Sequence, residues 1–273
     1  MTAPPEVRYA LIGSPVAHSR SPALQLAAFS ACGPPAVYEA IDVPVAGLGD
    51  AIARLRRDTY KGWNVTTPLK EAVIAHLDRL TQVAASDRAV NVVRREPDGS
   101  LTGHNTDGAG LVQALADVWS WEPRHKSALV LGSGPAARAI ASALRMHGIG
   151  FLYCWSRNAA AAALIGPLPL SKDTAPMATD LESVDAARVV KVDLIVSALP
   201  ADASLPAWIA AVADEHSSVF DLNYDADRSP VGGLRAARRS DGVPLLLHQG
   251  ALSFAWWTGL PQPLDVMRSA LGL

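Results

Sequence analysis

Two ionisable residues of this chain lie in segments that could carry out proton transfer. Lys70 closes segment 64–70, Asn-Val-Thr-Thr-Pro-Leu-Lys, and Asp107 lies in segment 105–108, Asn-Thr-Asp-Gly. A lysine beside a carboxylate can exchange a proton with a carbonyl or alcohol oxygen. Each residue has a structural alternative, because a lone lysine is usually a surface residue and Asp107 could cap the helix expected over 108–116.

A glycine-containing loop follows this pair along the chain. Segment 131–138 reads Leu-Gly-Ser-Gly-Pro-Ala-Ala-Arg and lies between a strand expected over 127–131 and a helix expected over 136–147. In such a turn the first glycine permits the bend, the second lets a dinucleotide diphosphate approach, and the helix N-terminus favours its charge. An ordinary strand–helix turn is the alternative. The predicted binding residues are Gly132, Ser133, Gly134, Pro135 and Ala136.

The end of the next strand, expected over 151–155, indicates which coenzyme fits. NAD sites usually carry an acid there for the ribose hydroxyls, whereas NADP sites carry a basic group for the phosphate. This chain has Ser156 and Arg157 and no acid at that point. Both side chains could hydrogen-bond a phosphate, so the segment favours NADP. The alternative is an exposed arginine, and segment 159–163 offers no second basic group.

With two further segments, 18–22 (His-Ser-Arg-Ser-Pro) and 249–251 (Gln-Gly-Ala), the chain resembles the shikimate dehydrogenase family over about 10–261. Several separate motifs occur in the family's order, which is more specific than any one of them. The resemblance implies an NADP-dependent oxidoreductase of aromatic amino acid (chorismate) biosynthesis. It would interconvert 3-dehydroshikimate and shikimate by hydride transfer, with Lys70 and Asp107 as the catalytic proton-transfer pair.

The resemblance also implies where a polyhydroxylated cyclohexene carboxylate would bind. Hydroxyl groups would hold its carboxylate, and amide or carboxylate groups would hold its hydroxyls. By themselves, the two serines of segment 18–22 look like helix-capping residues, which is the structural alternative. The implied substrate-binding residues are Ser19, Ser21, Thr66, Asn91, Tyr224 and Gln249, and further cofactor-binding residues are Leu222 and Gly242.

Several flanking positions depart from the family's usual sequence. Gln-Leu stands at 25–26 where the family usually has His-Asn, Arg88 replaces a glycine, and Leu199 replaces the threonine of an Asn-Ala-Thr motif. Two alternatives therefore stay open: the same chemistry on quinate or aminoshikimate, and a non-catalytic ligand-binding module on the same fold. The intact proton-transfer pair argues against the second, because a sensor has no need of proton transfer.

Alternating strands and helices predict an α/β fold with parallel-type sheets and two domains. We expect an N-terminal α/β substrate-binding and catalytic domain over 1–107, completed by 249–273, and a Rossmann-like NADP-binding domain over 108–248. The return of the C-terminal helix to the first domain is implied by the resemblance, whereas composition does not reveal it. Strands are expected over 7–13, 36–41, 62–66, 127–131, 151–155, 192–197 and 218–222, and helices over 22–30, 48–57, 69–76, 108–116 and 136–147, with one or two more after 249 and no assignment over 159–187.

The bulk composition excludes several classes of protein. A chain of 273 residues, 49% hydrophobic and 18% charged, can bury a substantial core. Its net charge of −2 gives no electrostatic case for nucleic acid or an anionic membrane. Two distant cysteines and no signal-peptide pattern favour a reduced cytoplasmic protein. No metal is expected, since the seven histidines are scattered. The expected partner is a small-molecule substrate, and the protein a monomer or homodimer.

Overall fold

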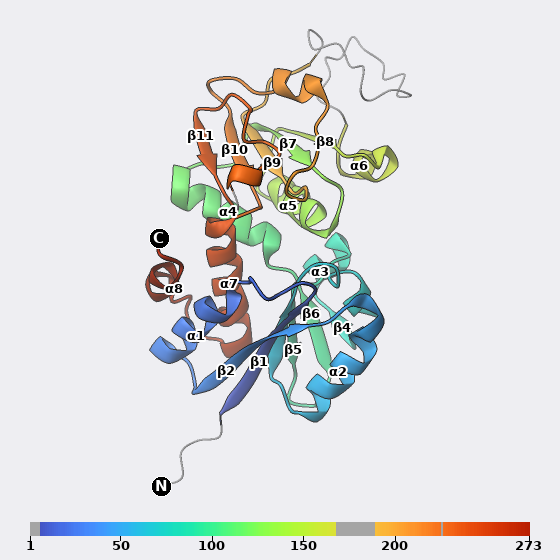
Figure 1. The fold of residues 1–273 in the computed structure, drawn as a ribbon, viewed down its shortest axis with the longest axis vertical. Helices are drawn as coiled ribbons and strands as arrows, with labels where there is room; N and C mark the ends of the chain where they lie inside the picture. Colours follow the sequence, from blue (N-terminus) through green and yellow to red (C-terminus); the bar gives the residue numbers. More distant parts are fainter. Residues whose placement is uncertain (1–5, 168–188, 225) are drawn as a thin grey trace. The chain divides into compact units, whose positions relative to one another are not determined.

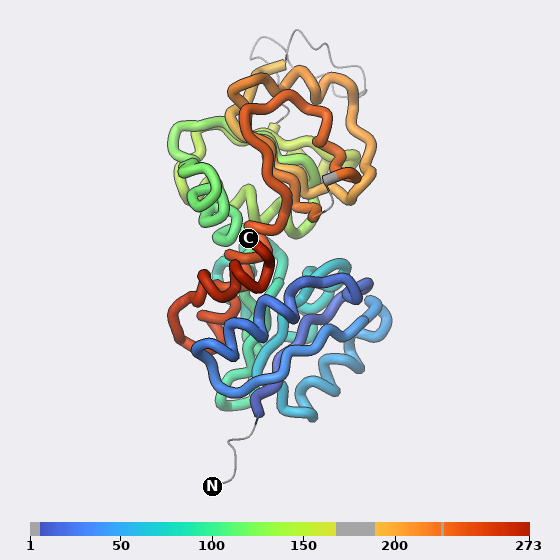
Figure 2. Tube along the Cα trace, turned by 60° about the vertical axis from the view of Figure 1, so that its left-hand side comes forward, coloured from blue at the N-terminus to red at the C-terminus, as the bar shows by residue number. Residues whose placement is uncertain are grey.

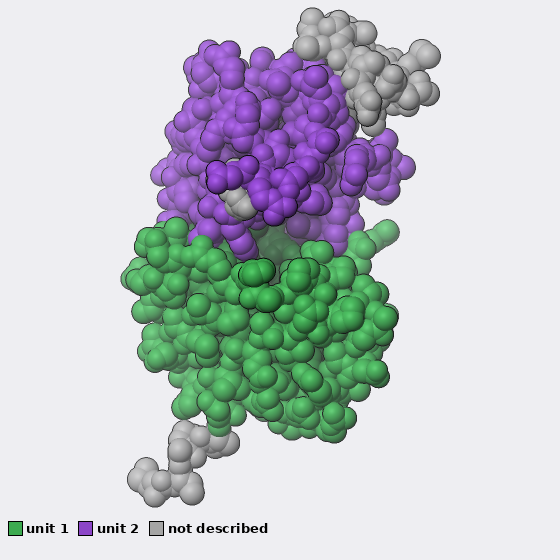
Figure 3. Space-filling view, viewed as in Figure 1, with its two compact units in different colours: residues 1–114, 245–273 green, residues 115–244 purple. Residues whose placement is uncertain are grey.

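The computed structural model describes residues 6–167, 189–224 and 226–273, and the chain divides into two compact units. Unit 1 comprises Met1–Ala114 and Leu245–Leu273, and unit 2 comprises Leu115–Pro244 (Figure 3). Each unit has its own β-sheet covered by helices (Figure 1). The predicted α/β fold class is confirmed, and the C-terminal helices belong to the same unit as the N-terminal strands.

The sheet of unit 1 is mixed rather than fully parallel. Its order is β2-β1-β3-β5-β6-β4. β1 is parallel to β2 and β3, and β4 is parallel to β6, whereas β5 is antiparallel to both β3 and β6. No strands were expected over 92–104, where the chain forms the β5–β6 hairpin. The strands are β1 Val7–Gly13, β2 Ala36–Asp42, β3 Gly62–Val65, β4 Arg79–Leu80, β5 Val92–Arg95 and β6 Leu101–His104.

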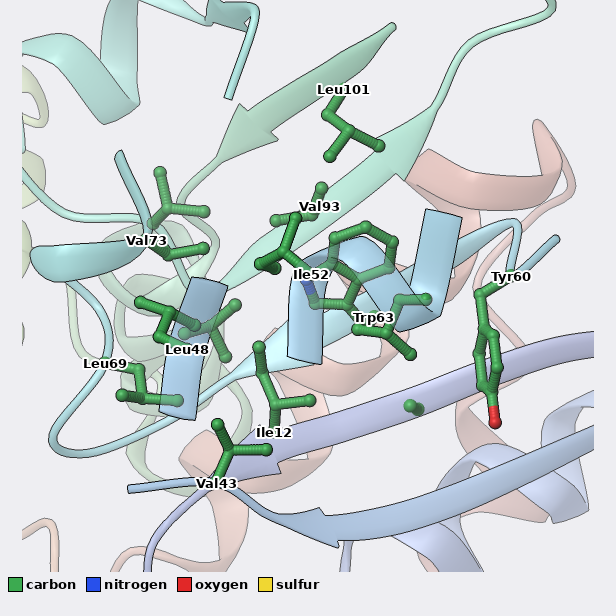
Figure 4. Close-up of a cluster of buried hydrophobic side chains, with 14 of the residues drawn as sticks. Ile12, Val43, Leu48, Ile52, Tyr60, Trp63, Leu69, Val73, Val93 and Leu101 are labelled. Atoms are coloured by element: carbon green, nitrogen blue, oxygen red, sulfur yellow. The ribbon is translucent and has the colours of Figure 1, made fainter. Parts of the chain in front are cut away.

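One face of this sheet is covered by helix α2, Leu48–Arg57. Alternate residues of a strand point to opposite faces, so Ala10 and Ile12 of β1 share one face. Both belong to a buried cluster that includes Ile52 of α2 and the fully buried Trp63 of β3 (Figure 4). Burial of this apolar surface is the main force that holds α2 on the sheet.

The other face carries α1 and the C-terminal helices. Tyr9 of β1 stacks on Phe29 of α1, with ring centroids 4.6 Å apart, and Phe29 meets Phe254 of α7 edge-on at 5.1 Å. Helix α8, near the C-terminus, packs on α1, the first helix of the chain (Figure 2). The three helices are α1 Ser21–Cys32, α7 Val243–Thr258 and α8 Leu264–Leu271.

Unit 2 has a five-stranded, fully parallel sheet of order β11-β10-β9-β7-β8. Helix α5 follows β7 and α6 follows β8, the alternation expected of a parallel α/β sheet. The division between the units falls within α4. The elements are α4 Asp107–Trp119, β7 Ser127–Leu131, α5 Pro135–Met146, β8 Phe151–Trp155, α6 Ala159–Ile165, β9 Leu194–Ser197, β10 Ser218–Asp221 and β11 Arg238–Ser240.

The expected helix over 69–76 is wrong. The chain forms turns after Pro68 and only a 3-10 helix, Ala72–His76. The Lys70 carbonyl accepts a hydrogen bond from the Val90 N–H at 2.9 Å, and an α-helix would need that carbonyl for its own ladder. The remaining short elements are α3 Gln82–Asp87 and the 3-10 turns Val45–Gly47, Ala207–Ala211 and Ala226–Arg228.

Other boundaries also differ from those expected. Helix α7 begins at Val243, six residues before the expected start of the C-terminal helices at Gln249. Of the unassigned segment 159–187, Ala159–Ile165 forms α6, and residues 168–187 lie outside the described residues. Among the described helices, none is both long and apolar enough to cross a membrane.

Truncation of Leu101 should destabilise the protein far more than truncation of Leu26. Leu101 is fully buried in the cluster of unit 1, whereas Leu26 on α1 is 40% exposed. Leu101→Ala should lower the free energy of unfolding by about 2–5 kcal/mol, because it removes buried methyl groups and leaves a cavity. Leu26→Ala should change it by about 0.5 kcal/mol or less. Urea unfolding of both variants checks this, and equal losses would show that Leu101 is no more buried than Leu26.

Candidate active site

Lys70 and Asp107 form a hydrogen-bonded ion pair. Lys70 Nζ lies 2.6 Å from Asp107 Oδ2, and the two side chains are only 15% and 7% exposed. Lys70 lies just beyond the end of β3, and Asp107 is the first residue of α4. The surface-lysine and helix-cap alternatives therefore do not describe these residues. Within the described chain the Asp107 carboxylate accepts from side chains rather than from amides of its own helix.

Asn91 holds the second oxygen of this carboxylate. Its Nδ2 lies 2.7 Å from Asp107 Oδ1, and its Oδ1 accepts from the Thr106 backbone N–H at 2.9 Å. The same Nδ2 is 2.9 Å from Thr106 Oγ1 and 3.3 Å from Gln249 Oε1. Asn91 thus links the start of β5 to the start of α4 and to α7, and it fixes the rotation of the carboxylate.

Gln249 reaches this cluster from α7. Its backbone carbonyl accepts hydrogen bonds from Thr106 Oγ1 at 3.1 Å and from Ser253 Oγ at 2.9 Å. Its side chain both approaches Asn91 and donates from Nε2 to the Leu246 carbonyl at 3.0 Å. Three segments distant in sequence are therefore joined by hydrogen bonds around the ion pair.

Ser19 and Ser21 lie in the loop between β1 and α1 and at the helix start. The Ser19 hydroxyl accepts from the Ser21 N–H at 3.2 Å, while no side chain caps α1. Within the described residues the Ser21 hydroxyl makes no hydrogen bond, and neither serine is bonded directly to Lys70 or Asp107. Arg20, between them, donates to the Leu271 carbonyl at the end of α8.

Thr66 follows β3 at the same edge of the sheet. Its N–H donates to the Ile12 carbonyl at 2.9 Å, and a Cβ on Gly13 would lie 2.3 Å from its Cγ2. Because β1 and β3 are parallel neighbours, the loops after them leave the sheet at the same edge. In α/β proteins, ligands bind at the carboxyl ends of the strands.

The glycine loop of unit 2 has the geometry that a diphosphate requires. Gly132 has φ +115°, and a Cβ there would lie 3.1 Å from the Ala198 carbonyl oxygen, so only glycine suits this turn. A Cβ on Gly134 would meet nothing within 4 Å, which leaves its backbone open to approach. Pro135 opens α5, and the amides of the first turn, beginning with Ala136, have no acceptor within the helix.

Ser133 and Ser156 connect this loop to the end of β8. Ser156 Oγ is 2.9 Å from Ser133 Oγ and 2.8 Å from the Asn158 carbonyl oxygen. A hydroxyl has one proton, so Ser156 donates it to the carbonyl and accepts from Ser133. A bond from the Ser156 hydroxyl to a phosphate oxygen would require giving up the bond to Asn158. Arg157 is exposed and forms no ion pair with the described residues.

Leu222, Tyr224 and Gly242 lie together in unit 2. A Cβ on Gly242 would lie 2.1 Å from the Leu222 carbonyl oxygen and 3.1 Å from Tyr224 Cδ1, so a larger residue would displace this loop. The Gly242 N–H donates to the Asn223 carbonyl at 2.9 Å. Gly242 immediately precedes α7.

Three polar residues of the cluster escaped the sequence analysis: Asn64, Thr106 and Ser253. Each is buried. Asn64 is a polar residue in an otherwise apolar strand, and Ser253 follows Gln249 by one helical turn, so both carried a detectable signal. Among the described residues, no group of three or more His, Cys, Asp or Glu could hold a metal ion.

Comparisons with known proteins agree on one family. Residues 11–93 match the shikimate dehydrogenase substrate binding domain, and residues 242–271 match the shikimate 5'-dehydrogenase C-terminal domain. Curated relatives named shikimate dehydrogenase (NADP(+)) include one from Thermus thermophilus, 37% identical over 98% of this chain and 100% of the relative. Another, from Moorella thermoacetica, is 36% identical over 96% and 93%.

Solved structures of shikimate dehydrogenases also resemble this one. Shikimate 5-dehydrogenase from Thermus thermophilus, in complex with NADP(H) and shikimate, resembles this structure with a TM-score of 0.78. The two chains are 33% identical, and the match covers 97% of this chain and 98% of the other.

Substitutions of the two serines should differ in their effect on stability. Ser19→Ala should lower the free energy of unfolding by about 0.5–1.5 kcal/mol, because the Ser21 N–H loses its acceptor. Ser21→Ala should leave stability nearly unchanged, because that hydroxyl has no partner among the described residues. Thermal unfolding of the two variants measures this, and each variant is the other's control. A larger loss in Ser21→Ala would show that Ser21 caps the helix.

Proposed function

The chain belongs to the shikimate dehydrogenase family, and we propose that it interconverts shikimate and 3-dehydroshikimate with NADP as coenzyme. The observation that carries the chemistry is the largely buried ion pair of Lys70 and Asp107, with 2.6 Å between Nζ and Oδ2. A non-catalytic module would have no use for such a pair. The reaction belongs to aromatic amino acid biosynthesis.

The proposed role of Lys70 is proton transfer at the reacting oxygen. Reduction of the ketone develops negative charge on that oxygen, and an ammonium group stabilises the charge and donates the proton. In the reverse direction the neutral amine accepts the proton of the alcohol. Asp107 keeps Nζ in place and balances its charge, while Asn91 prevents the carboxylate from turning away.

The proposed substrate site lies in unit 1, at the carboxyl ends of β1 and β3. Ser19 and Ser21 offer hydroxyl groups for the substrate carboxylate. The substrate hydroxyls would be held by Thr66, the amides of Asn91 and Gln249, and Asp107.

The proposed coenzyme site lies in unit 2. The residues fit a dinucleotide, because Gly132 makes the turn, Gly134 leaves its backbone open, and the start of α5 presents free amides. When bound, NADP supplies the chemistry of hydride transfer. Arg157 is the proposed phosphate contact, Ser133 and Ser156 shape the loop, and the backbone around Leu222 and Gly242 is the proposed nicotinamide contact.

Location and partners follow as further parts of this proposal. Both cysteines are free thiols, Cys32 exposed and Cys154 buried, and burial raises the pKa of the Cys154 thiol to about 12. Free thiols and a pyridine nucleotide coenzyme suit the cytoplasm. We propose small-molecule ligands, no nucleic acid or membrane partner, and a monomer or homodimer.

An absorbance assay of NADPH formation tests the proposed activity. Shikimate and quinate are each supplied with NADP⁺ and with NAD⁺, and the product is identified chromatographically. We expect turnover with shikimate and NADP⁺ that yields 3-dehydroshikimate. Preferential turnover of quinate would replace the substrate, and absence of turnover with every pair would refute the enzyme proposal.

Removal of the Lys70 ammonium should lower kcat far more than it weakens substrate binding. Lys70→Ala should reduce kcat by about 10²–10⁴-fold, the usual contribution of a general acid–base group. The KM for shikimate should change much less, because the group acts mainly on charge that develops during the reaction. The exposed Lys61 gives a matched control, since Lys61→Ala should retain full kcat. A kcat within a few-fold of wild type in Lys70→Ala would exclude it as the proton-transfer residue.

Removal of the Arg157 guanidinium should weaken NADP use specifically. A charge-assisted hydrogen bond contributes about 1.5–3 kcal/mol, so Arg157→Ala should raise the NADP⁺ KM by about tenfold or more. The NAD⁺ KM should barely change, because NAD⁺ lacks the ribose 2′-phosphate of NADP⁺. Arg124→Ala, at another exposed arginine of unit 2, is the control. Parallel changes in both coenzyme constants would show that Arg157 does not select the phosphate.

A further inference from the structure

A buried hydrogen-bond chain runs from β2 to the residues around the ion pair. The Tyr38 hydroxyl donates to Asn64 Oδ1 at 2.7 Å. Asn64 Nδ2 then donates to the Asn91 carbonyl at 3.1 Å and to Ser253 Oγ at 3.0 Å. Tyr38 and Asn64 are each 5% exposed, and Ser253 is fully buried.

The donors and acceptors around the Asn64 side chain permit only one orientation of its amide. Its oxygen faces the Tyr38 hydroxyl, and its two amide protons face the Asn91 carbonyl and the Ser253 hydroxyl. The Ser253 proton is already used, because Oγ donates to the Gln249 carbonyl at 2.9 Å. If the amide turned over, its oxygen would face the Asn91 carbonyl oxygen, and two acceptors would meet without a proton.

The orientation of the Asn64 amide matters because its two acceptors connect it to the site. One is Asn91 itself, and the other, Ser253, is bonded to Gln249. The Asn91 carbonyl also accepts from the Val65 N–H at 2.8 Å, so two donors of β3 hold this carbonyl. The side chain of the same residue binds the Asp107 carboxylate. On the other branch, Ser253 fixes the carbonyl of Gln249. A single amide therefore holds two of the proposed substrate-binding residues.

We propose that Tyr38 and Ser253 are positioning residues for the reaction. Neither is proposed to contact the substrate. They orient the Asn64 amide, and through it they set the places of Asn91 and Gln249 relative to the ion pair. This inference deepens the proposed function and rests on it, because it assigns the network to shikimate turnover.

The test compares Tyr38→Phe, Ser253→Ala and the double variant with wild type. Each single change removes one partner of Asn64. Each should raise the shikimate KM or lower kcat so that kcat/KM falls by about fivefold, which corresponds to about 1 kcal/mol for one hydrogen bond. The KM for NADP⁺ should stay unchanged. The double variant should lose less than the product of the single losses, because both changes release the same amide.

Two matched controls separate this role from general packing. Tyr9 packs on the same Trp257 ring as Tyr38, with centroid distances of 4.9 and 6.3 Å, but its hydroxyl has no hydrogen bond to the described residues. Ser269 Oγ donates to the Asp265 carbonyl at 3.0 Å in exposed α8, as Ser253 does to Gln249 in α7. Tyr9→Phe and Ser269→Ala should leave both KM values and kcat unchanged.

A measurement without substrate keeps this inference distinct from the proposed function. In ¹⁵N-labelled protein, hydrogen exchange of the Asn64 side-chain amide should be slow in wild type and faster in Tyr38→Phe and Ser253→Ala. If wild type fails to oxidise shikimate, the proposed function fails, and the exchange rates still test the orientation of the amide. Kinetic constants of both variants equal to wild type, or exchange rates that do not change, would overturn the positioning role.

Discussion

The Asp107 carboxylate is the constraint on which the rest of unit 1 depends. A carboxylate that is 7% exposed must have its charge paired and both oxygens bonded, because an unpartnered buried charge costs several kcal/mol. Lys70 supplies one donor and Asn91 the other. Lys70 follows β3, Asn91 precedes β5, and Asp107 begins α4, so these three segments must meet at one edge of the sheet.

The mixed sheet meets this requirement. β5 is antiparallel to β3, and the register pairs Asn64 with Val92, so β5 starts where β3 ends. β6 is antiparallel to β5 in turn and pairs His104 with Val92, which returns the chain to the same edge just before Asp107. In a fully parallel sheet, the start of β5 would lie at the opposite edge. The hairpin is therefore the element that brings Asn91 and Asp107 to Lys70.

What the sequence could predict depended on whether a signal was local. The strands Ser127–Leu131 and Phe151–Trp155 are apolar runs bounded by turn residues, and they were predicted with the bounds observed. The β5–β6 hairpin, which builds the site, was not predicted. The helix expected after Pro68 failed because a distant backbone group, the Val90 N–H, binds the Lys70 carbonyl. Asn64 and Ser253 carried a local signal, but a sequence does not reveal that they are hydrogen-bonded to each other across 189 residues.

The residues that depart from the family's usual sequence each have a defined structural role. Gln25, in place of the usual histidine, donates from Nε2 to the Gly250 carbonyl at 2.9 Å and so ties α1 to α7 beside Gln249. Arg88 stands where the family usually has glycine. It adopts the left-handed conformation that glycine favours, with φ +49°, and ends helix α3. Leu199 contributes its backbone carbonyl to Asn223 Nδ2 at 3.0 Å, a contact that does not depend on its side chain. Substitutions at these positions therefore alter surroundings while the ion pair and its donors are kept, which favours an enzyme over a binding module.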